Sequence, residues 1–172
     1  MKFNLLIILI FGISFSSISQ IDPNDIEIVR DSFGVPHIYA KTDAQVAYGL
    51  AWAHAEDDFE TIQYAYLAGN GLLGHYLGKD GIGADFLASF IGSEELYIKK
   101  FNTDISPEYI KVLEGYSAGL NSYAKHNPDE VLSSKLFPVT PKKMMKYGQL
   151  QLFMSSRGDY WVSRILNNNL DF

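Results

Sequence analysis

The sequence has no cysteine among its 172 residues. It therefore offers no disulfide framework, no thiolate nucleophile and no thiolate ligand for zinc. Its four histidines are scattered, and the H-E-x-x-H spacing of zinc proteases does not occur. The G-x-S-x-G pentapeptide of many serine hydrolases is missing as well. No complete catalytic machinery is visible in the residues taken by themselves.

An excess of positive charge is also lacking. The formal net charge is -6 and the isoelectric point is near 5.1, which argues against nucleic acid as a partner. Hydrophobic residues make up 47% of the chain and aromatic residues 14%. This share is large enough to form a core, so we expect a folded domain rather than a disordered tail.

The N-terminal apolar run is shorter than the roughly 20 residues that a membrane-spanning helix needs. It extends from Leu5 to Phe15, follows Lys2 and precedes the small residues Ser17 and Ser19. This order is typical of a secretory signal. We therefore predict a signal peptide over residues 1–19 and an exported protein, periplasmic or secreted, with no membrane partner.

The segment after the predicted signal peptide has the pattern of a β-hairpin followed by one long helix. Extended apolar patterns at residues 26–30 and 35–39 flank a turn-forming stretch. Thr42 and Gln45 then have the spacing of a capping box, which predicts a helix that continues to Gly69.

Within this helix two apolar stripes lie side by side and leave only a narrow polar face. The first stripe holds Tyr48, Trp52, Ala55, Phe59, Ile62 and Tyr66, and the second holds Ala47, Ala51, His54, Asp58, Thr61 and Ala65. The polar face holds Gln45, Glu56, Glu60 and Gln63. We expect the helix to have neighbours on several sides.

Further helices are predicted along the rest of the chain. A short segment at 72–77 and one or two short helices within 85–101 precede a helix from Ser106 to about His126. Thr140 begins another helix. The last quarter is rich in lysine and arginine, so we expect it to pack against the acidic hairpin and first helix.

Three local patterns invite a chemical interpretation. The letters G-x-G-x-x-G at residues 69–74 follow a helix rather than a strand, so a helix exit is favoured over a nucleotide site. His54 and Asp58, at i and i+4, are expected to share a buried hydrogen bond. Asp57 and Asp58 lie toward the apolar stripes and are expected to pair with Arg30 or His37, as a structural ion pair rather than a catalytic one.

Several segments resemble the penicillin acylase family. Residues 28–40 read IVRDSFGVPHIYA, similar to the family's R-D-x-x-G-[VM]-P-H-I-x-A, and related motifs follow at 48–57, 71–78, 113–123 and Thr140-Pro141. The residues that carry the first two motifs, together with the position that follows them, are Arg30, Asp31, Gly34, Pro36, His37, His54, Asp57 and Asp58. The chain departs from the family at Asp58, His75 and Met144, where members have Arg, Glu and Trp.

The resemblance implies an N-terminal nucleophile hydrolase made as a precursor. Residues 20–172 would be its α-subunit-like region, in the α+β class, mostly helical with an N-terminal β-hairpin, and part of an αββα fold. The catalytic Ser would be the first residue of a β subunit from the same precursor, so no catalytic residue is expected in this chain. The chain alone would then be inactive, and the precursor sequence would continue beyond Phe172.

The resemblance also suggests where substrate binds. Counting from Thr140 without gaps places Tyr160 and Trp161 at a pair of acyl-pocket residues, with Arg157 and Asp159 as weaker candidates. Some members bind calcium through a Glu at the position of Asn167, so no metal ligand is predicted here. No cofactor is expected, although a structural calcium is compatible with the full enzyme.

Two functions follow as alternatives. The first is the N-terminal part of an acylase acting on N-acylated small molecules such as penicillins, acyl-homoserine lactones or lipopeptides. The second is a non-catalytic exported binding or scaffold module with the same fold. A reading frame that continues into a Ser-led β region would distinguish the first from the second.

Overall fold

The computed structural model describes residues 21–167 and opens with a two-stranded antiparallel hairpin. Strands β1 (Glu27–Arg30) and β2 (Pro36–Tyr39) pair in a register that places Ile28 opposite Ile38. The predicted hairpin is therefore confirmed. The predicted signal peptide lies outside the described residues.

Helix α1 (Asp43–Gly69) begins and ends as the sequence predicts. The Thr42 hydroxyl accepts from the Gln45 backbone, and the Gln45 side chain accepts from the Thr42 backbone, which completes the capping box. The helix is not continuous, because Asp58 has non-helical backbone angles (φ -161°, ψ 75°). Its carboxylate accepts from the Thr61 backbone at 3.0 Å and caps the second half of the helix.

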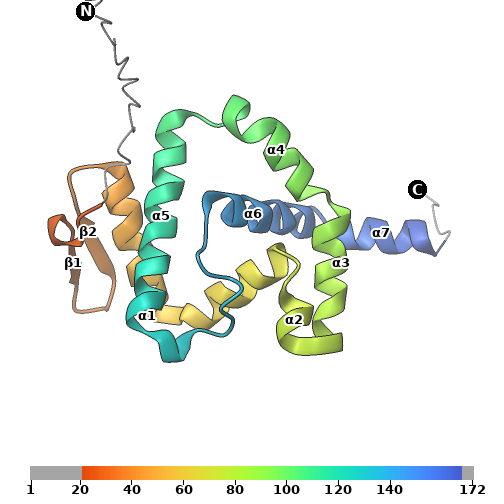
Figure 1. Cartoon of the computed structure of the whole chain (residues 1–172), viewed down its shortest axis with the longest axis horizontal. Helices are drawn as coiled ribbons and strands as arrows, with labels where there is room; N and C mark the ends of the chain where they lie inside the picture. The colour runs from red at the N-terminus through yellow and green to blue at the C-terminus, as the bar shows by residue number, and fades with distance from the viewer. Residues whose placement is uncertain (1–20, 168–172) are drawn as a thin grey trace, which may run out of the picture.

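The remaining chain is helical with short connections. Its elements are α2 (Leu73–Leu77), η2 (Gly78–Gly81), α3 (Ile82–Phe90), α4 (Ser93–Asp104), α5 (Pro107–His126), η3 (Pro128–Glu130), α6 (Pro141–Ser155) and α7 (Gly158–Leu166), and a short η1 (Pro23–Asp25) precedes the hairpin. The predicted starts at Ser106 and Thr140 are confirmed, since both side chains accept from the backbone three residues on. The hairpin and α7 lie at opposite sides of the body (Figure 1).

Helices α1 and α5 pack closely because two glycines of α5 face the backbone of α1. A Cβ atom at Gly115 would overlap the carbonyl oxygen of Ala44, and one at Gly119 would overlap that of Tyr48. Only a residue without a side chain fits these positions. The close approach explains why the first half of α1 buries so much of its circumference.

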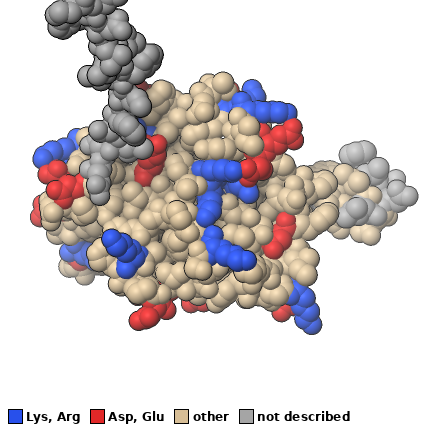
Figure 2. Space-filling model, in the orientation of Figure 1, with Lys and Arg blue, Asp and Glu red and all other residues tan. Residues whose placement is uncertain are grey.

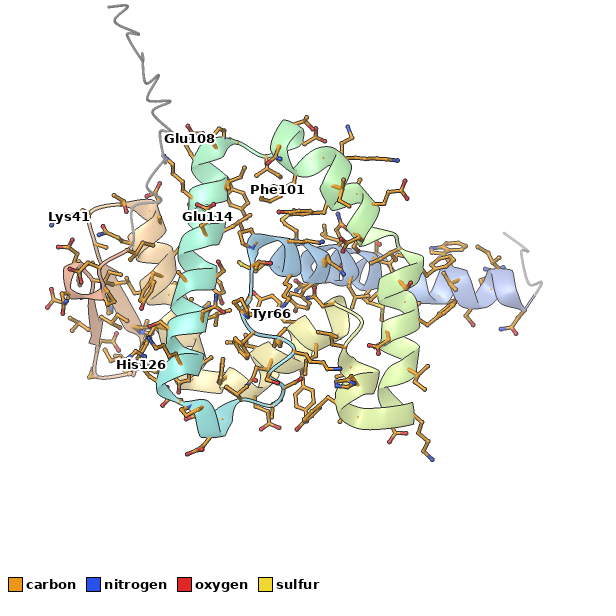
Figure 3. The ribbon with its side chains drawn as sticks, viewed as in Figure 1. Lys41, Tyr66, Phe101, Glu108, Glu114 and His126 are labelled. Carbon is orange, nitrogen blue, oxygen red and sulfur yellow. The ribbon has the colours of Figure 1, made fainter. Side chains whose placement is uncertain are left out.

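The core lies between α1, α5 and the loop that leads into α6. Its fully buried side chains include Leu67, Leu120, Leu136 and Val139. Tyr66, labelled in Figure 3, packs edge-on against Tyr147 of α6, with ring centroids 5.4 Å apart. The structure is thus mostly helical with an N-terminal hairpin, as predicted.

Two sequence predictions about the faces of α1 are wrong. Gln63 is buried, with 1% of its surface exposed, since its amide donates to Glu130 O and accepts from Leu132 N. The second apolar stripe is buried at Ala47 and Ala51, but His54, Asp58 and Thr61 are exposed. Asp58 and Thr61 lie at the break in the helix, where the regular periodicity that the prediction assumed is interrupted, and His54 pairs with the Tyr116 hydroxyl of α5.

The predicted packing of the last quarter against the first helix is confirmed, since α6 packs on α1 through contacts such as Tyr147 with Tyr66, but its charged side chains pair elsewhere. Lys142 and Lys146 of α6 pair with Glu94 of α4, not with the hairpin or α1. Figure 2 shows basic and acidic groups interspersed over the visible face, separated by wide uncharged areas. Among residues 21–167, no helix is both long and apolar enough to cross a membrane.

Candidate functional site

Arg30 joins the hairpin to α1. One guanidinium nitrogen lies 2.8 Å from the Asp57 carboxylate and 3.1 Å from that of Glu56. The other donates to the Gly34 carbonyl at 2.9 Å. The predicted pairing of Arg30 with Asp57 is confirmed, and the structure adds Glu56, which the sequence pattern had assigned only to the polar face.

The turn of the hairpin is organised by Asp31. One carboxylate oxygen accepts from the Phe33 and Val35 backbone at 2.8 and 3.0 Å, and the other lies 3.3 Å from His37 Nε2. These two backbone hydrogen bonds, and to a smaller extent the His37 side chain, hold the pKa of the Asp31 carboxyl below its ordinary value. Gly34 has a φ of +83°, which glycine adopts without strain. His37 therefore pairs within the hairpin and not with α1.

The predicted contact between His54 and Asp58 does not exist. His54 Nδ1 lies 3.0 Å from the Tyr116 hydroxyl of α5, while the Asp58 carboxylate accepts a hydrogen bond from the Thr61 backbone amide. Asp57 and Asp58 are both exposed, not turned into the core. The prediction assumed continuous helical spacing, and the break at Asp58 removes it.

Pro36 and Gly34 have backbone roles in the same motif. Pro36 stands opposite Arg30 in the ladder, and Gly34 N donates to Asp31 O at 3.0 Å across the turn. The motif residues shared with the family therefore form one hydrogen-bonded junction, which His54 and Asp58 do not join.

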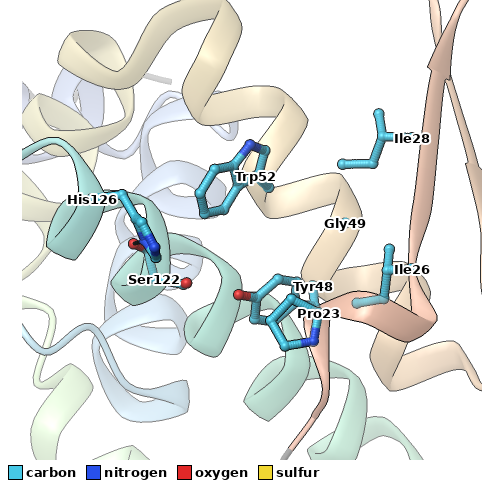
Figure 4. Close-up of a pocket in the computed structure, with 8 residues that line it drawn as sticks. All are labelled: Pro23, Ile26, Ile28, Tyr48, Gly49, Trp52, Ser122 and His126. Atoms are coloured by element: carbon cyan, nitrogen blue, oxygen red, sulfur yellow. Dashed lines mark hydrogen bonds between the residues drawn. The ribbon is translucent and has the colours of Figure 1, made fainter.

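A small hollow lies between the hairpin, α1 and α5 (Figure 4). Its volume is about 250 Å³, and its lining is Pro23, Ile26, Ile28, Tyr48, Gly49, Trp52, Ser122 and His126. His126 Nδ1 donates to the Ser122 carbonyl at 2.8 Å, so the ring is already held by its own helix. No carboxylate lines this hollow, and its volume is below the roughly 300 Å³ of the smallest usual ligand pockets.

Tyr160 and Trp161, the predicted substrate-binding residues, lie on α7. They are 39% and 44% exposed, and their rings meet edge-on at 5.3 Å. Arg157 stacks over the Tyr160 ring at 4.5 Å, and Arg164 donates to the Tyr160 hydroxyl at 3.1 Å. The helix projects from the body, away from the hairpin junction (Figure 1). The two predicted groups of residues are therefore far apart in the fold.

The glycine-rich segment is a helix exit, as expected. The amides of Leu73 and Gly74, at the start of α2, donate to the Asp85 carboxylate at 2.8 Å each. Asp85 lies on the next helix, and nothing in the local sequence indicated this role. Because its carboxylate occupies these amides, they are not available to a phosphate group.

Residues 21–167, the part of the chain that the structure describes, contain no group of three or more His, Asp or Glu side chains suited to a metal ion. Asn167, at the position where some members carry a calcium-binding Glu, donates to the Ser163 hydroxyl at 3.3 Å. The side chain of Asp159 lies outside the described residues.

The family model of penicillin amidase matches residues 25–165, nearly the whole described chain. The chain belongs to the penicillin amidase family. Penicillin G acylase of Escherichia coli is 27% identical over 150 residues, which are 83% of this chain and 17% of the relative. An acyl-homoserine lactone acylase PvdQ of Pseudomonas savastanoi is 30% identical over 103 residues, 55% of this chain and 13% of the relative.

Similarity to solved structures agrees with this assignment at the level of the fold. A penicillin G acylase chain from Alcaligenes faecalis superposes with a TM-score of 0.62 at 20% identity, covering 74% of this chain and 72% of that one. By contrast, the chain spans less than a fifth of the length of these curated relatives. The fold, mostly helical with an N-terminal hairpin, is thus similar to that of the penicillin G acylase chain.

Proposed function

We propose that this chain is the N-terminal, α-subunit portion of an exported amidohydrolase that cleaves the linear amide bond of N-acylated small molecules. The observation that carries the proposal is the match of residues 25–165 to the penicillin amidase family. The names of the relatives, penicillin G acylase and acyl-homoserine lactone acylase, support an acyl amide as substrate. The N-terminal apolar segment supports export.

The chain supplies scaffold and pocket, and a second portion supplies the nucleophile. Support comes from length, since the relatives are more than five times longer than the part matched here. One relative of Pseudomonas sp. is named as a proenzyme, which supports processing of a precursor into subunits. The partner in this proposal is the β subunit of the same precursor.

Helix α7 carries the acyl-pocket wall in this proposal. Trp161 and Ile165 follow at i and i+4, so both large apolar side chains lie on one stripe, and both are exposed in this chain. Tyr160 is held by Arg157 and Arg164 through cation–π contacts. A rigid aromatic wall of this kind suits the apolar acyl group of the substrate.

The test is expression of the complete reading frame that contains this chain. Gel analysis should show two subunits, and the product should release nitroaniline from N-acyl nitroanilides. Replacing Trp161 by Ala should raise KM roughly tenfold for a long acyl group, because uniform binding is lost, while the exposed α6 variant Leu152→Ala should leave KM unchanged. A frame without a Ser-led second region and without amidase activity would support the non-catalytic module instead.

A further inference from the structure

The hairpin has one face against α1 and one face turned away from it. Ile28 and Ile38 lie against Gly49 of α1, where an added Cβ would meet both side chains. Because side chains alternate along a strand, Val29 and Tyr39 point to the opposite side. Both are exposed. The outer side of the hairpin therefore carries Val29 and Tyr39 beside the polar Glu27 and His37, and the described chain leaves both large apolar side chains uncovered.

The tip of the hairpin adds two more apolar side chains. Phe33 is 91% exposed, and Val35 beside it is more than half exposed. We name the set Val29, Phe33, Val35 and Tyr39 the outer hairpin face. A large aromatic side chain exposed to this extent gains nothing from burial in the isolated chain.

The backbone of the tip is held in one conformation, although the Phe33 side chain is almost fully exposed. The Asp31 carboxylate fixes the amides of Phe33 and Val35, and the Arg30 guanidinium fixes the carbonyl of Gly34. Arg30 is in turn anchored to Asp57 of α1. The backbone that carries Phe33 is thus ordered before any partner arrives, which lowers the entropy lost on binding.

The charged groups next to the tip are already paired. Asp31 pairs with His37 and Arg30 pairs with Glu56 and Asp57. A partner that covers the tip therefore needs to supply an apolar pocket rather than a complementary charge. At protein interfaces a few central side chains buried in well-packed pockets, many of them aromatic, carry most of the binding energy.

We propose that the outer hairpin face docks into an apolar pocket of the larger, C-terminal portion of the same acylase precursor, with Phe33 as the central side chain. The proposal rests on the proposed function, because its occupant is the β subunit. The relatives supply the reason for this occupant, since more than four fifths of their length lies outside the matched segment. In the mature protein the β subunit would then cover the outer hairpin face, which is ordered and exposed in this chain.

The experiment uses the matured two-subunit protein from the complete reading frame. Its subunits are separated in urea and reassociated, and the apparent dissociation constant is measured for the natural protein and for the variants Phe33→Ser, Phe33→Leu and Ile98→Ser. Ile98 on α4 is 71% exposed and serves as a matched loss of apolar surface. We expect Phe33→Ser to weaken association at least about tenfold, Phe33→Leu to restore most of it, and Ile98→Ser to change it less than about twofold.

The outcomes separate the two proposals. Maturation into two active subunits with equal dissociation constants for Phe33→Ser and Ile98→Ser leaves the acylase function intact and overturns the docking site. A complete frame that yields no second subunit and no amidase activity overturns both. If Phe33→Ser converts a dimer of α chains to monomers while subunit association is unchanged, the face binds a second copy and the proposal is wrong.

Discussion

The Arg30 guanidinium lies 2.8 Å from the Asp57 carboxylate, across the junction between the hairpin and the longest helix. The same side chain reaches Glu56 and the Gly34 carbonyl, so one residue connects the turn, the strand and the helix. Without this connection the hairpin would depend on three isoleucines packed over Gly49. A two-stranded hairpin is marginal by itself, which makes the junction important.

Replacing Arg30 by Met should loosen the hairpin without unfolding the helices. We expect backbone amides of β1 and β2 to exchange roughly tenfold faster, because a partly exposed network with several partners contributes more than a single surface pair. Hydrogen exchange followed by NMR measures this. Lys41→Met, which removes the exposed pair with Asp25, is the control. Equal exchange in both variants would contradict the assigned role of Arg30.

Alanine substitutions at Gly115 and Gly148 should change stability in opposite directions, because only Gly115 lies where α5 contacts α1 closely. Gly115→Ala should destabilise the fold by about 2 kcal/mol, since its Cβ meets the Ala44 carbonyl and the helices must separate. Gly148→Ala in α6 meets nothing within 4 Å and should stabilise by about 0.5–1 kcal/mol. Urea unfolding measures both. A stabilising Gly115→Ala would show that the two helices are not packed this tightly.

The buried amide of Gln63 predicts a large cost for an apolar replacement of similar size. Gln63→Leu leaves Glu130 O and Leu132 N without their partner, and we expect a loss of about 2–4 kcal/mol. The exposed Gln151→Leu on α6 should stay within about 0.5 kcal/mol of the natural protein. Chemical denaturation of the two variants in parallel tests this, and similar midpoints would refute it.

Burial predicts a stability that falls at alkaline pH. Desolvation raises the pKa of Tyr66 well above its ordinary value of 10.0, so the folded protein keeps the phenol proton that the unfolded chain releases. The contribution of Tyr66 to the free energy of unfolding is then fully present below about pH 10 and is lost as the pH rises above it. Unfolding free energies measured between pH 8 and 11 should fall less steeply for Tyr66→Phe. A slope that Tyr66→Phe leaves unchanged would contradict this assignment.

The hairpin turn should open at acid pH. Because the pKa of Asp31 is lowered by the amides of Phe33 and Val35, its contribution is present above the ordinary value of 3.8 and is lost as the pH falls below it. The amide resonances of Phe33 and Val35 should move together in an NMR titration from pH 5 to 2. In Asp31→Asn they should not titrate, and a titration that persists there would assign the effect to another group.

Local signals predicted much of the fold. The capping box at Thr42, the helix starts at Ser106 and Thr140, and the hairpin were all confirmed. Each depends on hydrogen bonds between residues at most four positions apart, apart from the pairing of the two adjacent strands. The family motifs were also recognisable, because they lie in continuous stretches that the family model covers.

Contacts between distant segments were predicted less well. The sequence allowed Arg30 or His37 to pair with Asp57 or Asp58. The structure pairs Arg30 with Asp57 and with Glu56. Gln63 was assigned to a polar face because glutamine is usually exposed, but the 130–132 loop supplies partners that no local pattern reveals. The role of Asp85 at the start of α2 was missed for the same reason.

The sequence by itself determined where helices and strands begin, which motifs they carry and which family the chain resembles, because these depend on neighbouring residues. Only the tertiary structure decided that α1 breaks at Asp58, that His54 faces Tyr116, and that Phe33 stands exposed on an ordered turn. Those outcomes depend on how segments far apart in the chain compete for the same surface and the same hydrogen-bonding groups. Such competition is settled by packing in three dimensions, which residue spacing along the chain does not encode.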